Sequence, residues 1–158
     1  MNKIATNQSK TIKLTNVLKY KCLLQQEYFD FNIAIEQMKS YIQVKGAIQI
    51  GPLIQYTKPL LNEANELEVE MSIMLQNNNF IHSIEEPYSM ESVLRVTNCM
   101  YCRYIGPEDK LKFAYAKLNL EAFEDDIQLK GDSYTIFVDQ NEEENTIIAD
   151  VFMPRVDS

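Results

Sequence analysis

Apolar and polar residues alternate along several stretches of this chain, a pattern typical of strands with one buried face. The clearest alternation runs over residues 66–76, where one face carries Leu67, Val69, Met71, Ile73 and Leu75. The opposite face of that strand would carry Glu68, Glu70, Ser72 and Met74. The same criterion predicts strands at 17–28, 48–57, 66–76, 93–105, 133–139 and 146–153, a short strand at 80–82, and a turn or bulge at Gly51-Pro52.

Two segments instead show the three- and four-residue spacing of helices. The first begins after Asp30, a good N-cap residue, and stops at Gly46. The second, at 110–124, follows Pro107 and the acidic pair Glu108-Asp109, which favour a helix start. Its predicted buried stripe contains Leu111, Ala114, Tyr115, Leu118, Ala122 and Phe123.

Strand, helix, strand, strand therefore occurs twice, over roughly 18–76 and 93–153. This order predicts an α+β fold of two βαββ halves that form an antiparallel sheet with two helices packed on one face. Residues 1–16 are polar and lack periodicity, so we expect a flexible leader there, or at most a loose first strand. The rest, 17–158, is expected to be a single domain.

Composition narrows the function classes. Hydrophobic residues make up 46% and charged residues 24% of the 158 positions, which is the balance of a folded protein. Because 23 acidic residues outnumber 15 basic ones and no basic patch stands out, we expect no direct nucleic-acid partner. The chain shows neither an apolar signal-peptide core nor the roughly 18 apolar residues of a membrane span. Three cysteines, an odd number, fit a reducing compartment, so the prediction is a cytoplasmic protein without a membrane partner.

Catalytic and cofactor signals are weak. Cys99 and Cys102 have the spacing of a redox pair or half a zinc site, but an offset of three places strand residues on opposite faces, which favours ordinary cysteines. Nucleophilic catalysis needs a base beside the nucleophile, and His82, the only histidine, lies on a connecting segment. The sequence therefore gives little support for a catalytic triad. Four scattered glycines support no phosphate loop, and the acidic runs 124–126 and 142–144 resemble solvated surface. We therefore expect no enzyme, no metal and no cofactor.

The strand face that points away from the helices is more informative. It is expected to present the acidic face of 66–76 together with Cys102, Tyr104, Thr135, Phe137, Asp150 and Phe152. Aromatic rings supply contact area and attract cations, while carboxylates balance charge, so such a face suits a flat apolar or cationic molecule. The alternative is a second packed or solvent-exposed surface without a ligand.

The C-terminal third resembles a known family. The segment Tyr104-Ile105-Gly106, a helix with aromatic residues, then 134–139 and the closing run 150–154 (Asp-Val-Phe-Met-Pro) resemble the gyrase-inhibitor-like (GyrI-like) small-molecule-binding domain, which is also the effector module of multidrug-responsive transcription regulators. The resemblance implies a ligand cleft between the two halves. Thr135 stands where many members carry a glutamate that contacts cationic drugs, and residues 1–16 cannot hold a helix-turn-helix, so the chain would not contact DNA itself.

The chain also resembles uncharacterised Gram-positive proteins associated with type VII secretion loci, through the run 137–140 (Phe-Val-Asp-Gln), which implies an accessory or protective protein-binding role.

Three functions remain open. The first is a standalone, non-catalytic domain that holds a small apolar or amphipathic ligand, cationic or neutral, in the cleft; its expected contacts are Glu70, Tyr104, Thr135, Phe137, Asp150 and Phe152. The second is a protein-interaction role with a basic partner, such as a secreted effector or gyrase. The third is a hydrolase that uses Glu70 with Tyr104.

Overall fold

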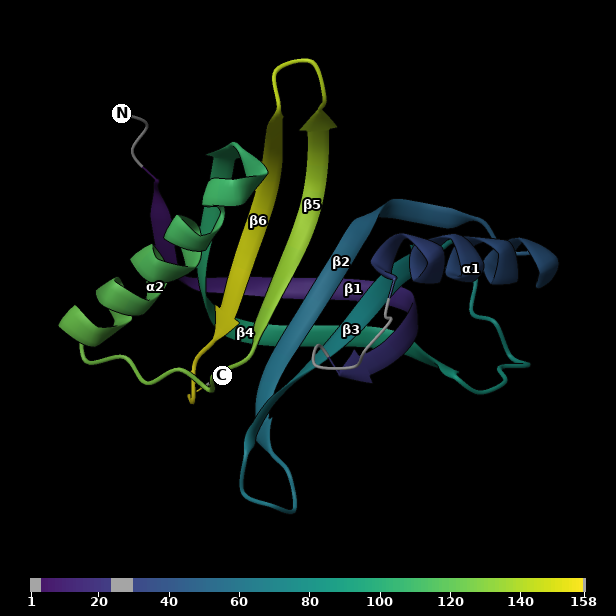
Figure 1. Cartoon of the computed structure of the whole chain (residues 1–158), viewed down its shortest axis with the longest axis horizontal. Helices are drawn as coiled ribbons and strands as arrows, with labels where there is room; N and C mark the ends of the chain where they lie inside the picture. The colour runs from purple at the N-terminus through teal and green to yellow at the C-terminus, as the bar shows by residue number, and fades with distance from the viewer. Residues whose placement is uncertain (1–3, 24–29, 158) are drawn as a thin grey trace. The chain divides into compact units, whose positions relative to one another are not determined.

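The computed structural model describes residues 4–23 and 30–157. Its elements are β1 (Thr6–Leu23), α1 (Phe31–Val44), β2 (Gln49–Leu61), β3 (Leu67–Asn77), β4 (Tyr88–Gly106), the 3-10 turn η1 (Glu108–Lys110), α2 (Lys112–Glu124), β5 (Ser133–Asn141) and β6 (Thr146–Pro154), drawn in Figure 1. The chain divides into two compact units. Unit 1 comprises Met1–Ile12 and Arg95–Ser158, and unit 2 comprises Lys13–Leu94.

The predicted fold class is wrong. Within the described residues, six strands form a closed antiparallel barrel in the order β1-β3-β2-β5-β6-β4, and not a sheet of two βαββ halves with both helices packed on one face. Alternation of apolar and polar residues assigns side chains to faces, but it does not say whether the edges of a sheet pair with one another. The sequence pattern therefore had no signal for closure.

The first strand starts much earlier than expected. Residues 6–16, predicted as a flexible leader or at most a loose strand, belong to β1, and Ile12 and Leu14 on it are buried. The predicted end of this strand, 24–28, lies outside the described residues. Residues 80–82 form no strand, although one was predicted there. Whether 17–158 acts as a single domain stays a prediction.

In unit 2, β3 lies between β1 and β2 and pairs with both in antiparallel register. The register between Ile50 and Ile54 shifts at the predicted Gly51-Pro52 bulge, which confirms it. The core lies between this sheet and α1. Figure 1 shows the course of α1 and of the strands β1, β2 and β3. Its buried residues are Leu18, Cys22, Ala34, Met38, Ile42, Met71, Ile73, Leu75 and Ile81.

In unit 1, β6 lies between β4 and β5 and pairs with both in antiparallel register. Its core lies between these strands and α2. The buried residues of this core are Met100, Cys102, Tyr104, Ala114, Leu118, Ala122, Ile147, Ala149, Val151 and Met153. On β6 every second residue from Ile147 to Met153 therefore faces α2, and Asp150 and Phe152 point to the other side.

The ends of α1 follow the predicted chemistry. Asp30 caps α1, since its Oδ1 accepts a hydrogen bond from the Ile33 amide at 3.1 Å, and Gly46 follows the helix with a φ of 77°. For the second helix the predicted start is wrong, since Pro107, Glu108 and Asp109 belong to η1 and its cap, and α2 begins at Lys112 without an acidic residue in its first turn. Of the stripe predicted for the second helix, Ala114, Leu118 and Ala122 are buried. Leu111 and Tyr115 are partly buried, and Phe123 is 80% exposed, so its predicted place in the stripe is wrong. No helix among the described residues is long and apolar enough to cross a membrane.

Candidate functional site

The candidate site lies on the face of the unit 1 sheet that points away from α2, here called the helix-free face of unit 1. Cross-strand register defines its members, because residues directly opposite each other share a face. Tyr101 on β4 lies opposite Phe152 on β6, and Arg103 lies opposite Asp150. On β5, Tyr134 and Ile136 lie opposite the same two β6 residues. The helix-free face of unit 1 thus contains Tyr101, Arg103, Tyr134, Ile136, Asp150 and Phe152.

The carboxylate of Asp150 is the polar centre of this face. Arg103 donates to it from two nitrogens, Nε to Oδ1 at 2.8 Å and Nη2 to Oδ2 at 3.0 Å. Tyr101 also donates its hydroxyl to Oδ1 at 2.9 Å. Paired donation from one guanidinium is the strong, oriented form of the Arg–carboxylate contact. The charge of Asp150 is therefore already balanced, and an incoming cation would have to compete with Arg103.

These contacts also affect the titration of the donors. Burial, followed by the hydrogen bond to Asp150, raises the pKa of the Tyr101 phenol above its usual value. The hydrogen bond to the carboxylate raises the pKa of Arg103, so its guanidinium stays charged. At neutral pH the face therefore holds a neutral phenol beside a charged guanidinium–carboxylate pair.

Aromatic rings form the apolar part of the face. The ring centroids of Tyr101 and Phe152 are 4.9 Å apart, in a tilted arrangement. The Nζ atom of Lys10 lies 5.3 Å from the Tyr101 centroid, within the range of a cation–π contact. Phe152 is buried, whereas Tyr101 and Asp150 are partly accessible. The accessible region is therefore centred on Tyr101, and its ring already attracts a cation.

Three of the predicted ligand residues lie on the other side of this sheet. Tyr104 belongs to the core beneath α2, and its hydroxyl donates to the carbonyl of Pro107. Thr135 lies opposite Val151 and Phe137 lies opposite Ala149, both of which face α2. The expectation that these three residues share a face with Asp150 and Phe152 is wrong. That these three residues contact a ligand stays a prediction, and it no longer rests on a face shared with Asp150 and Phe152.

In unit 2 the predicted acidic face is correctly assigned. Met71, Ile73 and Leu75 face α1, so Glu70 and its alternate neighbours point away from the helix. Glu70 Oε1 lies 3.4 Å from Nζ of Lys21, and Lys58 is its opposite neighbour on β2. Ser72 and Met74 on the same face are buried. Glu70, like Asp150 in unit 1, thus has a basic partner.

Sequence reasoning missed Tyr101, Arg103 and Lys21, although a signal for them exists. Residues 15–23 read TNVLKYKCL and residues 97–105 read TNCMYCRYI, each opening with Thr-Asn inside a long strand. Asn16 and Asn98 have positive φ angles of 49° and 54°. Five residues after each asparagine stands a basic residue, Lys21 or Arg103, paired with a carboxylate. Alignment of the two segments would have singled out Lys21 and Arg103 as equivalent positions, but not their carboxylate partners.

The two cysteines of the Cys-x-x-Cys spacing lie on opposite faces, as predicted. Cys102 is in the core beneath α2, so its expected place on the face that points away from the helices is wrong. Cys99, opposite Pro154, is on the other side of β4. Burial raises the pKa of Cys99 to about 11 and that of Cys102 to about 12. Both are therefore thiols at neutral pH, without the thiolate character of reactive cysteines.

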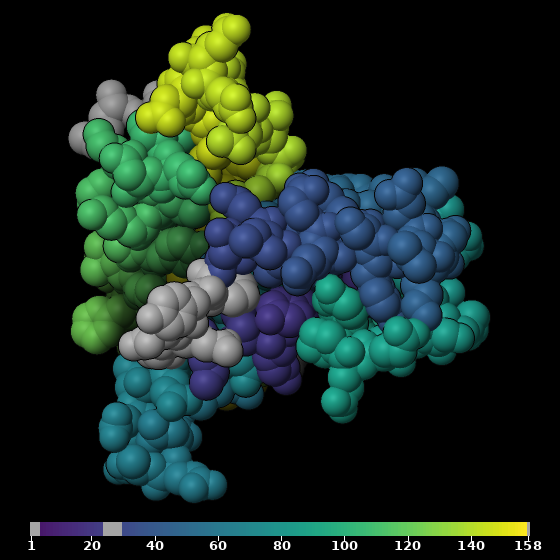
Figure 2. All heavy atoms as spheres, turned by 45° about the vertical axis from the view of Figure 1, so that its right-hand side comes forward, coloured from purple at the N-terminus to yellow at the C-terminus, as the bar shows by residue number. Residues whose placement is uncertain are grey.

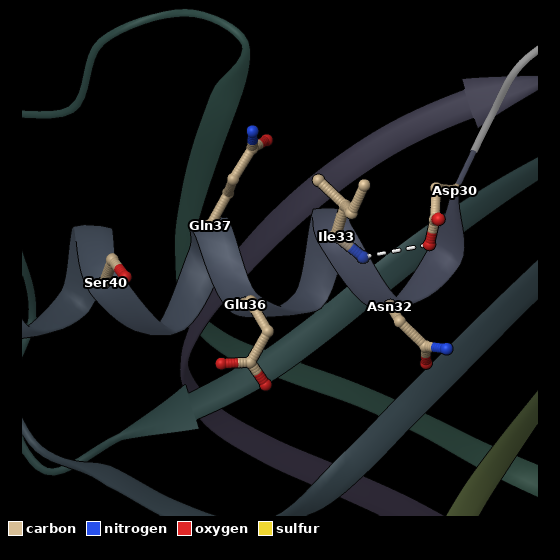
Figure 3. Close-up of a pocket in the computed structure, with 6 residues that line it drawn as sticks. All are labelled: Asp30, Asn32, Ile33, Glu36, Gln37 and Ser40. Atoms are coloured by element: carbon tan, nitrogen blue, oxygen red, sulfur yellow. Dashed lines mark hydrogen bonds between the residues drawn. The ribbon is translucent and has the colours of Figure 1, made fainter.

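A separate pocket of about 470 Å³ lies along the first turns of α1 and is lined by Asp30, Asn32, Ile33, Glu36, Gln37 and Ser40. Figure 3 shows that the side chains of Ile33 and Gln37 point to one side of the helix, while those of Asn32 and Glu36 point to the other. Asp30 is already occupied as the helix cap. Because the polar groups do not converge, this pocket is a weaker candidate than the helix-free face of unit 1.

The sequence matches no known family model and no curated protein. Solved structures do match. The isolated C-terminal domain of EcmrR superposes with a TM-score of 0.67 at 14% identity, over 96% of this chain and 97% of that domain. A hydrolase from Listeria innocua superposes with a TM-score of 0.58 at 9% identity, over 94% of this chain and 91% of that protein. SAV2435 bound to tetraphenylphosphonium superposes with a TM-score of 0.52 at 11% identity, over 94% of each chain.

EcmrR in its complex with DNA also matches, with a TM-score of 0.67 at 16% identity over 94% of this chain, but the chain spans only 57% of that protein's length. Identities this low speak for the fold alone. The predicted link to type VII secretion finds no support among these structures and stays a prediction. By its fold, the chain resembles the C-terminal domain of EcmrR and SAV2435, as the GyrI-like resemblance in its sequence implied.

Proposed function

We propose that this chain is a binding domain for a small, flat or amphipathic cation, and that the helix-free face of unit 1 provides the contacts. The observation that carries the proposal is the position of the Tyr101 ring, which adjoins Phe152, donates to Asp150 and lies under the Lys10 ammonium. Ring faces attract an organic cation. The Asp150 carboxylate supports this by balancing the charge of Arg103, which would otherwise repel the ligand. The ligand would displace Lys10 from the ring.

The structural neighbours support the same chemistry. SAV2435 was solved bound to tetraphenylphosphonium, a cation whose charge lies inside four apolar rings. Such an ion loses little hydration on binding, so it can exchange with the Lys10 ammonium without a large desolvation cost. Of the residues predicted from sequence, Asp150 and Phe152 belong to this face, and Glu70 offers a second, separately paired carboxylate in unit 2.

The experiment is a thermal-shift titration with tetraphenylphosphonium, with triphenylphosphine oxide as a neutral ligand of similar shape. A ligand that binds only the folded chain raises its melting temperature in a saturable way. We expect a rise with the cation, a smaller rise with the neutral compound, and loss of the cation response in Tyr101→Ala. A flat response to both compounds in the wild type would contradict the proposal.

A matched control exists for the carboxylate. Arg155 and Asp157 form a second two-nitrogen pair in unit 1, with Nε to Oδ1 at 2.9 Å and Nη2 to Oδ2 at 2.8 Å. Asp150→Asn should weaken cation binding, whereas Asp157→Asn removes the same charge from a similar pair and should leave binding unchanged. Equal effects of the two substitutions would mean that only net charge matters, and would count against a site at Asp150.

A second candidate is a protein-interaction role with a basic partner. The turn between β5 and β6 presents Glu142, Glu143 and Glu144, all exposed, on a chain of net charge −8. Charge complementarity of this kind speeds association and is weakened by salt. The check is a pull-down at low and high salt with the wild type and a variant in which the three glutamates are glutamines. A partner retained equally by both proteins would contradict it.

Three predictions accompany this proposal. The absence of catalysis stays a prediction, and a hydrolase stands among the structural neighbours. The hydrolase alternative needs Glu70 with Tyr104, and the Tyr104 hydroxyl already donates to Pro107. The absence of a direct nucleic-acid partner also stays a prediction, since the longer EcmrR chain was solved with DNA. The third prediction that stays open is a cytoplasmic location.

A further inference from the structure

The helix α2 carries apolar residues on two of its faces. One face packs into the core of unit 1 through Ala114, Leu118 and Ala122. The other face consists of Phe113, Ala116, Leu120 and Phe123, here called the exposed stripe of α2. Phe113 is 55% exposed, Leu120 57% and Phe123 80%. Figure 2 shows α2, in green, at the surface of the molecule.

Single exposed apolar side chains are common on proteins, but a continuous line of them on one helix is not. The members of the exposed stripe follow one another at steps of three, four and three residues. That is the a/d spacing with which one helix packs along another, each side chain inserting between those of the partner helix. The stripe therefore has the pattern of a helix–helix seam that residues 4–23 and 30–157 leave open.

The charges at the two ends of α2 indicate the orientation of the missing helix. Lys112 is its first residue and Lys110 precedes it, whereas Glu124 is its last residue and Asp125 and Asp126 follow it. Glu108 and Asp109 stand before Lys110, in η1. A second α2 running antiparallel would bring Lys112 of each helix to Glu124 of the other and Lys110 to Asp126, while Glu108 and Asp109 would meet the uncharged Gln128 and Ile127. A parallel copy would instead place like charges side by side, which is unfavourable.

We propose that the exposed stripe of α2 binds the same stripe of a second copy of this chain, antiparallel about a twofold axis that passes near Leu118. A twofold interface must be self-complementary, so positions equally far from its centre meet. Phe113 then packs against Phe123 of the second copy, and Ala116 leaves room for Leu120 of the second copy. The largest residues meet at the ends and a small residue meets a large one near the middle.

The seam is short, because α2 has 13 residues and is therefore about 20 Å long. Its contact area is smaller than the roughly 1,600 Å² that stable complexes bury, so the dimer forms and dissociates with concentration. This interface is independent of the ligand face, because the exposed stripe and the helix-free face of unit 1 are on different elements.

The test is sedimentation velocity of the full chain over a wide range of protein concentration. We expect the weight-average sedimentation coefficient of the wild type to rise with concentration, and that of Phe123→Glu to stay at the monomer value. Val44→Glu is the matched control, since Val44 is an apolar residue of α1 with 82% exposure, and it should associate like the wild type. A monomeric wild type, association of Phe123→Glu, or equal loss in Val44→Glu would each overturn the proposal.

Charge reversal tests the antiparallel orientation and provides variants with intact apolar surfaces. Lys112→Glu makes both ends of α2 acidic, and Glu124→Lys adds a positive charge to the acidic end. Each variant alone should associate more weakly than the wild type. An equimolar mixture of the two should recover association, because the reversed ends then meet opposite charges. A mixture no stronger than the separate variants would overturn the antiparallel arrangement.

Discussion

Tyr115 on α2 and Thr135 on β5 are joined through their side-chain hydroxyls by a hydrogen bond beneath the helix. Thr135 is only 2% exposed, and burial raises the pKa of the Tyr115 phenol above its ordinary value, so the phenol keeps its proton at neutral pH. A buried hydroxyl that loses its partner keeps its desolvation cost. This pair therefore links α2 to the sheet of unit 1, and removal of either hydroxyl should lower the stability of the fold.

Replacement of Thr135 by Val keeps the shape of the side chain and removes its hydroxyl. The Tyr115 hydroxyl is then left without this partner, and we expect the free energy of unfolding to fall by about 1–3 kcal/mol. The measurement is urea unfolding followed by circular dichroism.

Tyr115→Phe provides the control for that change. If the two hydroxyls depend on each other, the double variant should be less destabilised than the sum of the two single variants, because neither group is then left unpaired. Additive losses would show that the hydrogen bond contributes little and that the single effects come from packing.

The asparagine inside β1 gives a second prediction. Asn16 has a φ of 49°, and its Nδ2 donates to the Asn77 carbonyl while Nδ2 of Asn77 donates back to the Asn16 carbonyl. Asn16→Ala should destabilise unit 2, because alanine tolerates this backbone conformation poorly and lacks the donor. Asn16→Gly lacks only the donor, so it should be the milder change, by about 1 kcal/mol in urea unfolding. An equal or larger loss for glycine would rule out a conformational role for Asn16.

Gly106, at the end of β4, has no room for a side chain because the Tyr104 ring lies against it. A Cβ atom at Gly106 would lie 2.7 Å from the Tyr104 hydroxyl oxygen, closer than atoms can approach. Gly106→Ala should therefore displace the Tyr104 hydroxyl from the Pro107 carbonyl and lower stability by roughly 1–3 kcal/mol. Thermal unfolding of the variant measures this cost. In a Tyr104→Phe background the closest atom is gone, so the same substitution should cost less; an unchanged cost would place the clash elsewhere.

The contrast between β3 and β5 explains which parts of the site could be predicted. Over residues 67–73 of β3, apolar residues alternate with Glu and Ser, so the sequence assigned Glu70 and Met71 to the correct faces. On β5, residues 134–138 (Tyr-Thr-Ile-Phe-Val) are apolar at both parities, apart from one threonine. Such a run does not tell which residues face the helix, and Thr135 and Phe137 were assigned to the wrong face.

Other features depend on contacts between distant residues and could not be read locally. Helix α1 and its Asp30 cap were predictable because a capping side chain acts within its own turn. The pairing of Arg103 with Asp150 joins strands 47 residues apart, and closure of the barrel depends on which strand edges meet. In residues 6–16 the buried pair Ile12 and Leu14 did alternate, but the surrounding Asn, Gln and Ser residues suggested a leader.

The buried thiols predict how stability depends on pH. Burial raises the pKa of Cys102 to about 12 and that of Cys99 to about 11, against an ordinary value of 9.0. Between pH 9 and these values the native state keeps protons that the unfolded chain releases. The unfolded chain then binds fewer protons, so the free energy of unfolding falls as pH rises. Below about pH 8 the stabilisation is complete, and by pH 10.5 roughly 1–2 kcal/mol per thiol should be lost.

Urea unfolding at pH 8 and pH 10.5 measures this loss, and Cys102→Ala separates the thiol from the lysines and tyrosines that titrate in the same range. The variant should be less stable than the wild type at pH 8, because it leaves a small cavity in the core beneath α2. Its additional loss at pH 10.5 should be smaller than that of the wild type, since it has one fewer thiol to ionise on unfolding. The surface variant Val44→Ala should lose as much as the wild type. Equal losses in all three proteins would mean that Cys102 ionises in the folded chain as readily as in the unfolded one.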